Sequence, residues 1–416
     1  MSDAIDAGPP PLAPAQVTIV VLNWRRADDT IACLASLAAA RLDGARVLVV
    51  DNGSGDGSVA RIRAAAPAVP IIALAENRGY AGGNNAGIEQ ALADGAAAVL
   101  LLNNDTLVSP DFLAPLVEAL AASPEAAAVC GAVHRHDRPE LLDVAWSEVR
   151  FADRHAVQLR GVNAVPGEGF DQRRNVEIAV GCVLLLRATA LRQIGLLDET
   201  YFAYHEDVEW GLRARAAGWQ LFYEPYARVY HRGSASTGVG GRTADPGATD
   251  AVNLALPNAE VLRPNPVRAY LGGRNVVRLL RAYATPEERR SFVKQLARRV
   301  PLELAALALD RQGWLRLGRF DWAEAARVFF LDRHGLPRGP LAGAARRRRA
   351  LRLAVLAPVD VVWGAPHAVW SAWRAGRLSE ATAELRGLLD GWRDRPLPLV
   401  RLGLRPAAGE EGAQGR

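Results

Sequence analysis

The stretch VLLLNNDTLVSPDF at residues 99–112 decides the fold that the sequence predicts. An apolar run of strand type stops at Leu102, and Asn103, Asn104 and Asp105 follow at once. Continuous apolar character predicts a strand that is buried on both faces, as in a parallel sheet. Oxygen-bearing side chains directly after such a strand predict a ligand at its carboxyl end.

The same pattern recurs over the first 130 residues, where apolar runs alternate with helical patterns. Asn23, Asp51, Asn77 and Asp105 each follow one of four successive strand runs, namely VTIVVLN, RVLVVDN, PIIALAEN and AAVLLLNND. Helices between strands imply parallel crossovers, so the fold class is α/β with a doubly wound, mostly parallel sheet. The four polar side chains are then expected to face one crevice.

The pattern is less regular between 131 and 176, where we expect irregular segments, a hairpin and contact with substrate. A strand is predicted over VEIAVGCVLLLR at 176–187, and a helix over YHEDVEWGLRARAAG that ends near Gly218. Two last strand segments, WQLFYE and ARVYH, reach His231.

These patterns predict four parts of the chain. Residues 1–15 read as a disordered Pro-rich leader without the features of a signal peptide, and 16–235 as the α/β domain. Residues 236–265 are rich in Gly, Ser and Thr and read as a flexible linker. Residues 266–416 read as a basic helical region.

Charge is distributed unevenly along the chain. Residues 251–416 hold 29 Lys and Arg against 15 Asp and Glu, whereas 1–250 hold 21 against 30. Such a basic excess predicts an anionic partner, and a membrane surface or a lipid diphosphate fits as well as nucleic acid. Three widely spaced cysteines argue against a disulfide framework and a zinc site, and favour a reducing cytosolic compartment: Cys33, Cys130 and Cys182.

An arginine cluster at 346–349 precedes a Trp-bearing apolar stretch at 351–373. Asp360 and two prolines, Pro358 and Pro366, interrupt its apolar character, which weighs against a transmembrane helix. An interfacial helix with its arginines on anionic headgroups is a second interpretation. A helical subdomain with a solvated basic face is the third, and the sequence leaves all three open.

The three residues 103–105 suit a divalent cation, because Mg²⁺ and Mn²⁺ prefer oxygen ligands and leave positions open for phosphate oxygens. The alternative is that Asp105 forms an Asx-turn or caps the next helix. Ser109, followed by Pro110, is already a good helix cap, so the metal interpretation is favoured.

The run DNGSGDGS that begins at Asp51 has two interpretations. Gly53 and Gly55 fit a dinucleotide-binding fingerprint and Glu76 stands near the position of its ribose-binding acid, but Ser58 replaces the third glycine. An NAD-dependent oxidoreductase is therefore an alternative function. In the other interpretation, Asp51 meets the base or ribose of a nucleotide and the glycines allow a tight turn.

The run ENRGYAGGNNAGI combines glycines with amides, including Asn77, Gly79 and Asn85. Glycines permit close approach to a ligand, and the following helix offers its N-terminal amides to negative charge. The alternative is a plain turn from strand to helix.

The run YHEDVEW places three acids in the first turn of a helix. Glu209 fits a complement to the helix dipole. Glu206 and Asp207 follow aromatic residues that suit the wall of a sugar-binding cleft, where a carboxylate can take a proton from a hydroxyl. His231 by itself reads as structural.

Seven motifs in this order resemble the inverting family-two glycosyltransferases of GT-A fold, in particular their rhamnosyltransferase-like branch. The resemblance covers roughly residues 16–235. The matching runs are VVLNW, VVDNGSGDGS, ENRGYAGGNNAGI, LLNNDT, VGCVLLLR, GLLDETYFAYHEDVEWGLRARAAGW and VYHRGS.

The resemblance implies a role for each motif. Asp207 is the expected catalytic base with Glu206 in support, and Asp105 and His231 are the expected ligands of Mg²⁺ or Mn²⁺. Asn103 stands where the metal motif often has its first acid, so less charge would hold the metal. The expected donor-binding residues are Asn23, Asp51, Asn77, Gly79, Asn85, Asn103 and Asn104.

The implied activity is metal-dependent transfer, with inversion, of a sugar such as rhamnose from a nucleoside diphosphate. The acceptor would be lipid-linked or a polysaccharide of the cell envelope, at the cytoplasmic face of the membrane, which the basic C-terminal helices would contact. Nucleic acid is not an expected partner. A nucleotide-sugar-binding protein without catalysis, acting as a scaffold, is the alternative from a different class.

Overall fold

The computed structural model describes residues 12–153, 155–167, 169–232, 266–309, 343–345, 347–348, 365–374 and 378–404. The chain forms two compact units. The first comprises residues 1–149, 157–241 and 396–416, and the second comprises 150–156 and 242–395. The predicted linker at 236–265 and most of the segment at 351–373 lie outside the described residues.

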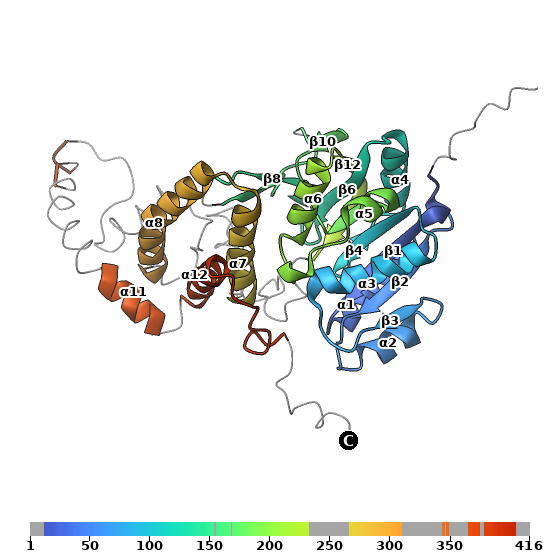
Figure 1. The fold of residues 1–416 in the computed structure, drawn as a ribbon, viewed down its shortest axis with the longest axis horizontal. Coiled ribbons are helices and arrows are strands. Elements are labelled where there is room, and N and C mark those ends of the chain that lie inside the picture. Colours follow the sequence, from blue (N-terminus) through green and yellow to red (C-terminus); the bar gives the residue numbers. More distant parts are fainter. Residues whose placement is uncertain are drawn as a thin grey trace, which may run out of the picture. The chain divides into compact units, whose positions relative to one another are not determined.

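The first unit is built on a ten-stranded sheet (Figure 1). Its main path has the order β10-β12-β6-β11-β4-β1-β2-β3, while β5 pairs with β12 and β7 with β6. The strands of this sheet are β1 (Val17–Asn23), β2 (Arg46–Asp51), β3 (Ile71–Ala73), β4 (Ala98–Asn103), β5 (Thr106–Val108), β6 (Ala126–Arg135), β7 (Leu142–Val144), β10 (Arg174–Val176), β11 (Val183–Arg187) and β12 (Gln220–His231). A separate hairpin pairs β8 (Trp146–Val149) with β9 (Val157–Arg160).

The pairing confirms the predicted fold class, an α/β unit with a mostly parallel sheet. β3, β2, β1 and β4 are mutually parallel, and β12 is parallel to β6. β11 runs antiparallel between β4 and β6, so the carboxyl ends of β4, β6 and β12 lie at one edge. The start of β11 lies at that same edge, because Val183 pairs with Leu102.

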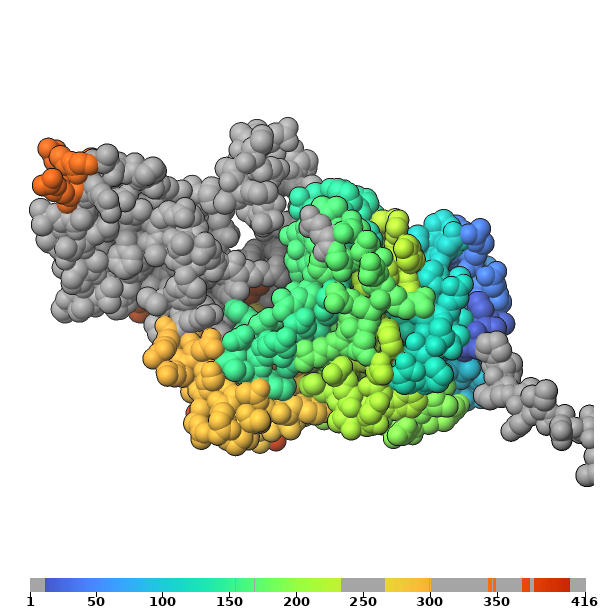
Figure 2. Space-filling view, turned by 90° about the horizontal axis from the view of Figure 1, so that it is seen from above, coloured from blue at the N-terminus to red at the C-terminus, as the bar shows by residue number. Residues whose placement is uncertain are grey.

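Helices cover the sheet, and α3 lies in front of β1 and β2 in Figure 1. α1 and α2 pack against each other. The space-filling view in Figure 2 shows the blue, teal and green segments of this unit as one continuous mass. The helices are η1 (Pro14–Gln16), α1 (Ala27–Ala38), α2 (Ser58–Ala65), α3 (Gly79–Ala93), α4 (Leu113–Ala122), α5 (Ala188–Ile194), η2 (Glu199–Tyr201) and α6 (Glu206–Ala216).

Three local predictions differ from the structure. The strand expected at 176–187 is interrupted: β10 ends at Val176 and β11 begins at Val183, and Gly181 lies in the break. The last two strand segments form one strand, β12, with a register shift between Glu224 and Arg228. Ser109 does not cap a helix, because α4 begins only at Leu113 after Phe112.

The second unit contains four described helices of more than one turn: α7 (Pro266–Tyr283), α8 (Pro286–Leu309), α11 (Ala365–Arg374) and α12 (Ser379–Trp392). α7 and α12 pack closely, since a Cβ atom on Gly273, Gly387 or Gly391 would lie within 2.6 Å of a carbonyl oxygen of the facing helix. Among the residues that the structure describes, no helix combines the length and apolar character needed to cross a membrane.

Candidate active site

Polar side chains meet at the carboxyl ends of β1, β2 and β4, as the sequence predicted. Asn23 Nδ2 donates to Asp51 Oδ1 at 2.6 Å, and both residues are fully buried or nearly so. Asn23 Oδ1 accepts from Thr30 Oγ1 at 2.7 Å, which in turn accepts from Asn104 Nδ2 at 2.9 Å. This chain of hydrogen bonds holds three of the expected donor-binding residues in one network.

Asn52, which the sequence did not single out, shapes the next turn. Its Nδ2 donates to Asn77 Oδ1 and to the Gly79 carbonyl at 2.9 Å each, and its Oδ1 accepts from the Arg78 N–H at 2.9 Å. Gly79 has φ +76°, and a Cβ there would lie 2.4 Å from the Phe202 carbonyl oxygen. The turn at 77–79 therefore needs glycine, because the segment carrying Phe202 passes directly against it.

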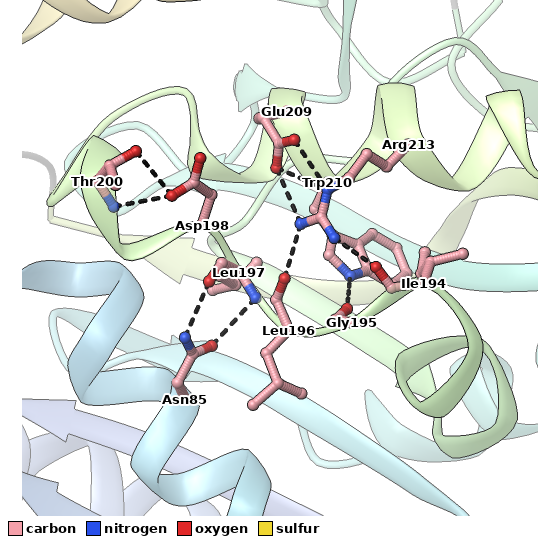
Figure 3. Close-up of polar contacts among 10 residues, drawn as sticks. All are labelled: Asn85, Ile194, Gly195, Leu196, Leu197, Asp198, Thr200, Glu209, Trp210 and Arg213. Atoms are coloured by element: carbon pink, nitrogen blue, oxygen red, sulfur yellow. Dashed lines mark hydrogen bonds and ion pairs between the residues drawn. The ribbon is translucent and has the colours of Figure 1, made fainter.

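Asn85 joins α3 to the segment 194–198 rather than presenting its amide to an open pocket (Figure 3). Its Nδ2 donates to the Leu197 carbonyl at 2.9 Å, and its Oδ1 accepts from the Leu197 N–H at 3.1 Å. Asn85 is buried. Its predicted contact with a donor stays a prediction, and the observed contact is a structural one.

Asp105 and His231 come together at the ends of β4 and β12. His231 Nε2 lies 3.2 Å from Asp105 Oδ1, and His231 Nδ1 lies 2.8 Å from Asp143 Oδ2. When Nδ1 carries the proton toward Asp143, the lone pair of Nε2 points to the Asp105 side, as a metal ligand requires. Asp143 was not foreseen, because nothing near it in the sequence marks it.

The donor set fits a divalent cation. Asn103 Oδ1 is buried and has no hydrogen-bond partner among the described residues, and Asn103 stands two residues before Asp105 in the chain. No cluster of three or more acidic, His or Cys side chains that would hold a metal by itself is found in the described part of the chain. A cation here would thus take its remaining ligands from phosphate and water, as Mg²⁺ commonly does.

The charge of His231 depends on the carboxylates of Asp105 and Asp143. Burial by itself lowers the pKa of His231, but the negative charges and hydrogen bonds of Asp105 and Asp143 outweigh it and raise the pKa to about 10. The two carboxylates therefore favour a proton on His231 when no cation is bound. A cation would take the place of the proton on Nε2.

Asp207 lies at the start of α6, and backbone hydrogen bonds connect it to Asn103 in the candidate metal motif. Asn103 N–H donates to the Cys182 carbonyl at 3.0 Å, and Gly181, the residue before Cys182, donates its N–H to Asp207 Oδ2 at 2.8 Å. Tyr80 donates its hydroxyl to the Gly181 carbonyl at 2.8 Å. The break before β11 thus places the expected base beside the end of β4.

The segment before α6 is strained. Phe202, Tyr204 and His205 have φ of +62°, +69° and +69°, values that side-chain-bearing residues rarely adopt. Such strain costs on the order of 1–3 kcal/mol per residue and concentrates at functional sites. Upstream of these residues, the segment 194–198 is held in place by side-chain contacts.

Those contacts come from α6 as well as from α3 (Figure 3). Arg213 Nη2 donates to the Leu196 carbonyl at 2.7 Å, and Trp210 Nε1 donates to the Gly195 carbonyl at 3.0 Å. Glu209, expected to complement the helix dipole, also pairs with Arg213 at 2.8 Å. α6 is therefore anchored within its first two turns, next to Asp207.

An α/β unit with polar strand ends, an acid–imidazole pair and an anchored carboxylate at one sheet edge defines an enzyme domain of the ligand-binding α/β class. The family described as glycosyl transferase family 2 matches residues 18–194. An N-acetylglucosaminyl-diphospho-decaprenol L-rhamnosyltransferase of Mycobacterium tuberculosis is 31% identical over 229 residues, which cover 49% of this chain and 72% of that protein. The chain belongs to the family-2 glycosyltransferases.

Two more distant similarities accompany this one. A low-salt glycan biosynthesis hexosyltransferase of Haloferax volcanii is 26% identical over 201 residues, which cover 48% of this chain and 61% of that protein. The solved structure of a mannosyltransferase from Pyrobaculum calidifontis in complex with GDP-Man and Mn²⁺ aligns with a TM-score of 0.47 and 16% identity, covering 90% of this chain and 89% of that one.

Proposed function

We propose that this protein is a metal-dependent, inverting glycosyltransferase that moves a sugar from a nucleoside diphosphate to a lipid-linked or polysaccharide acceptor of the cell envelope. The observation that carries the proposal is the backbone link from Asn103 through Cys182 and Gly181 to Asp207. It sets a carboxylate base beside the strand end that suits a diphosphate and its cation.

Each group has a defined role in this mechanism. Asp51, Asn23 and the turn at 77–79 bind the nucleoside side of the donor. Asn103, Asp105 and His231 would hold Mg²⁺ or Mn²⁺, which supplies charge neutralisation for the departing diphosphate. Asp207 takes the proton of the acceptor hydroxyl, whose oxygen bonds to the anomeric carbon as the bond to the phosphate oxygen breaks on the opposite face.

The acceptor class follows from the relatives and the charge of the chain. The M. tuberculosis relative is named for transfer of rhamnose to a sugar on decaprenyl diphosphate. This name supports a lipid-linked acceptor and makes rhamnose the first donor sugar to test. The basic excess after residue 250 supports action at the cytoplasmic face of a membrane with anionic headgroups.

The test combines donor binding with transfer. We expect one UDP-, dTDP- or GDP-sugar to raise the Tm only with Mg²⁺ or Mn²⁺ present, since a ligand of the folded state stabilises it. Asp105→Asn should weaken this cation dependence. Asp207→Asn should keep the shift yet lower transfer by about 10²–10⁴-fold, the usual contribution of a general base.

Glu89→Gln, at an exposed position of α3, is the matched control and should behave like the wild type. A protein that binds the donor but neither transfers nor hydrolyses it would instead be a nucleotide-sugar-binding scaffold. Full transfer by Asp207→Asn would remove that residue from the mechanism.

A further inference from the structure

Glu206 and Asp207 are adjacent, but their carboxyl groups have different surroundings. Asp207 Oδ2 accepts from the Gly181 N–H and Oδ1 from the Val208 N–H, at 2.8 Å each. Glu206 is 5% exposed, and its Oε2 is buried without a hydrogen-bond partner among the described residues. The fold therefore supplies donors to both oxygens of Asp207 and leaves one oxygen of Glu206 without any.

This difference decides which group holds a proton more easily. A buried carboxylate oxygen without a donor loses its hydration and gains nothing in return, whereas a protonated carboxyl group is neutral and brings its own O–H donor. Two adjacent buried anions would also repel each other. One proton on the pair relieves both costs, and it is best placed on Glu206, because Oε2 of its carboxyl group has no donor among the described residues.

The neighbouring titratable groups do not favour an ionised Glu206. On α6, the charge of Asp207 opposes a second anion. On α3, burial and nearby acids raise the pKa of Tyr80, which stays neutral. Burial, followed by the charge of Asp105, likewise raises the pKa of Cys182.

We propose that Glu206 carries a proton in the resting enzyme and acts as a neutral positioning residue, which leaves the single negative charge of the pair on Asp207. The proposal rests on the proposed function, since it concerns the residue next to the base. A neutral Glu206 keeps Asp207 available as the base. If Glu206 were ionised, the proton of the pair would be on Asp207, which could then not accept the proton of the acceptor hydroxyl.

The pKa values point the same way. Burial, and then the charge of Asp207, raises the pKa of Glu206 well above its ordinary value. Burial also raises the pKa of Asp207, but the N–H groups of Gly181 and Val208 oppose that rise.

The pH dependence of the Tm tests whether Glu206 is protonated, and it requires no substrate. An acid whose pKa is raised by folding favours the folded state below its unfolded pKa, about 4.3 for Glu, and this advantage is lost as pH rises toward the folded pKa. Glu206→Gln keeps the neutral shape and has no such loss. We expect its Tm to match the wild type near pH 4 and to exceed it at pH 8.

Infrared spectroscopy gives an independent readout. The wild type at pH 7 should show the carbonyl stretch of a buried protonated carboxyl group, which Glu206→Gln should lack and Asp207→Asn should retain. If Glu206→Gln does not fold, the infrared spectra of the wild type and of Asp207→Asn still test the proposal. Absence of this band, or parallel Tm curves for wild type and Glu206→Gln, would overturn the proposal.

Transfer assays separate this proposal from the proposed function. Glu206→Gln should stay within about tenfold of the wild type, while Asp207→Asn falls by about 10²–10⁴-fold. Glu206→Gln as inactive as Asp207→Asn, although folded, would contradict a neutral Glu206. If no variant transfers sugar but the infrared band is present, the proton assignment stands and the proposed function fails.

Discussion

Gly181 is the residue on which the geometry of the candidate base depends most directly. Its N–H donates to Asp207 and its carbonyl accepts from Tyr80. A Cβ at this position would lie 3.3 Å from Asp207 Oδ2 and 3.5 Å from the Tyr80 hydroxyl oxygen. Because the first distance is tighter than ordinary contact, a side chain here must displace the carboxylate by a few tenths of an ångström.

Gly181→Ala should therefore impair catalysis more than binding. Displacements of about 1 Å can cost about 10²-fold in rate, so we expect a smaller shift to lower kcat by about tenfold with the donor KM unchanged. Steady-state kinetics of transfer will measure this split. Gly272→Ala is the control, since a Cβ there meets nothing within 4 Å. An unchanged kcat would show that Asp207 tolerates the shift.

At this scale, the sequence predicted residue types better than contacts. Asn23, Asp51 and Asn104 lie at the predicted edge, and Asp105 lies beside His231 as the family resemblance implied. The structure adds Asp143, which bonds His231 across 88 residues of chain. A contact across such a separation leaves no local pattern, so one sequence could not reveal it.

Among the elements, the segment 194–198 connects the two halves of the candidate site. Asn85 holds it from α3, and Arg213 and Trp210 hold it from α6 (Figure 3). The hydrogen bonds go to backbone groups, so they fix the path of the chain into η2 and α6. In this way, α3, which follows the turn at 77–79, is joined to α6, which carries Asp207.

Asn85→Ala tests the importance of this connection. It leaves the Leu197 N–H and carbonyl groups buried without their partner, each at a cost of about 1–3 kcal/mol, so we expect a loss of about 2–6 kcal/mol in the free energy of unfolding. Urea denaturation measures it. Gln90→Ala, at an exposed position of α3, should change stability by less than about 0.5 kcal/mol. Equal stability of the two variants would contradict the structural role of Asn85.

Element prediction succeeded where periodicity was strong. The predicted helical region at 266–416 contains α12 over Ser379–Trp392, and the helix predicted from YHEDVEW forms α6. The strand predicted at 176–187 was wrong in its first half. Apolar character is nearly continuous there, but the chain leaves the sheet so that Gly181 can bond Asp207, a contact that residue patterns do not encode.

For the whole molecule, the second unit depends on close helix packing. α12 approaches α7 so closely that a Cβ on Gly387 would lie 2.0 Å from the Tyr270 carbonyl oxygen. Tyr270 itself donates its hydroxyl to Asp390 Oδ2 at 3.0 Å, so the two helices are also joined by a side-chain hydrogen bond. This packing leaves no space for a methyl group.

Gly387→Ala should separate α7 from α12 and destabilise the second unit by about 1–3 kcal/mol, the usual cost of overpacking. Far-ultraviolet circular dichroism during urea unfolding will measure this loss of stability. Gly272→Ala, in the facing helix but without a close neighbour, should instead be neutral or stabilise by up to about 1 kcal/mol. A neutral Gly387→Ala would show that the helices can move apart without loss.

The sequence by itself determined the alternation of strands and helices up to β4, the polar strand ends and the uneven charge, because these depend on local periodicity and composition. Tertiary structure alone decided the antiparallel insertion of β11, the contact of His231 with Asp143 and the unequal surroundings of Glu206 and Asp207. The physical reason is separation along the chain. Burial and hydrogen-bond partners come from segments far apart in sequence, and only the folded chain brings them together.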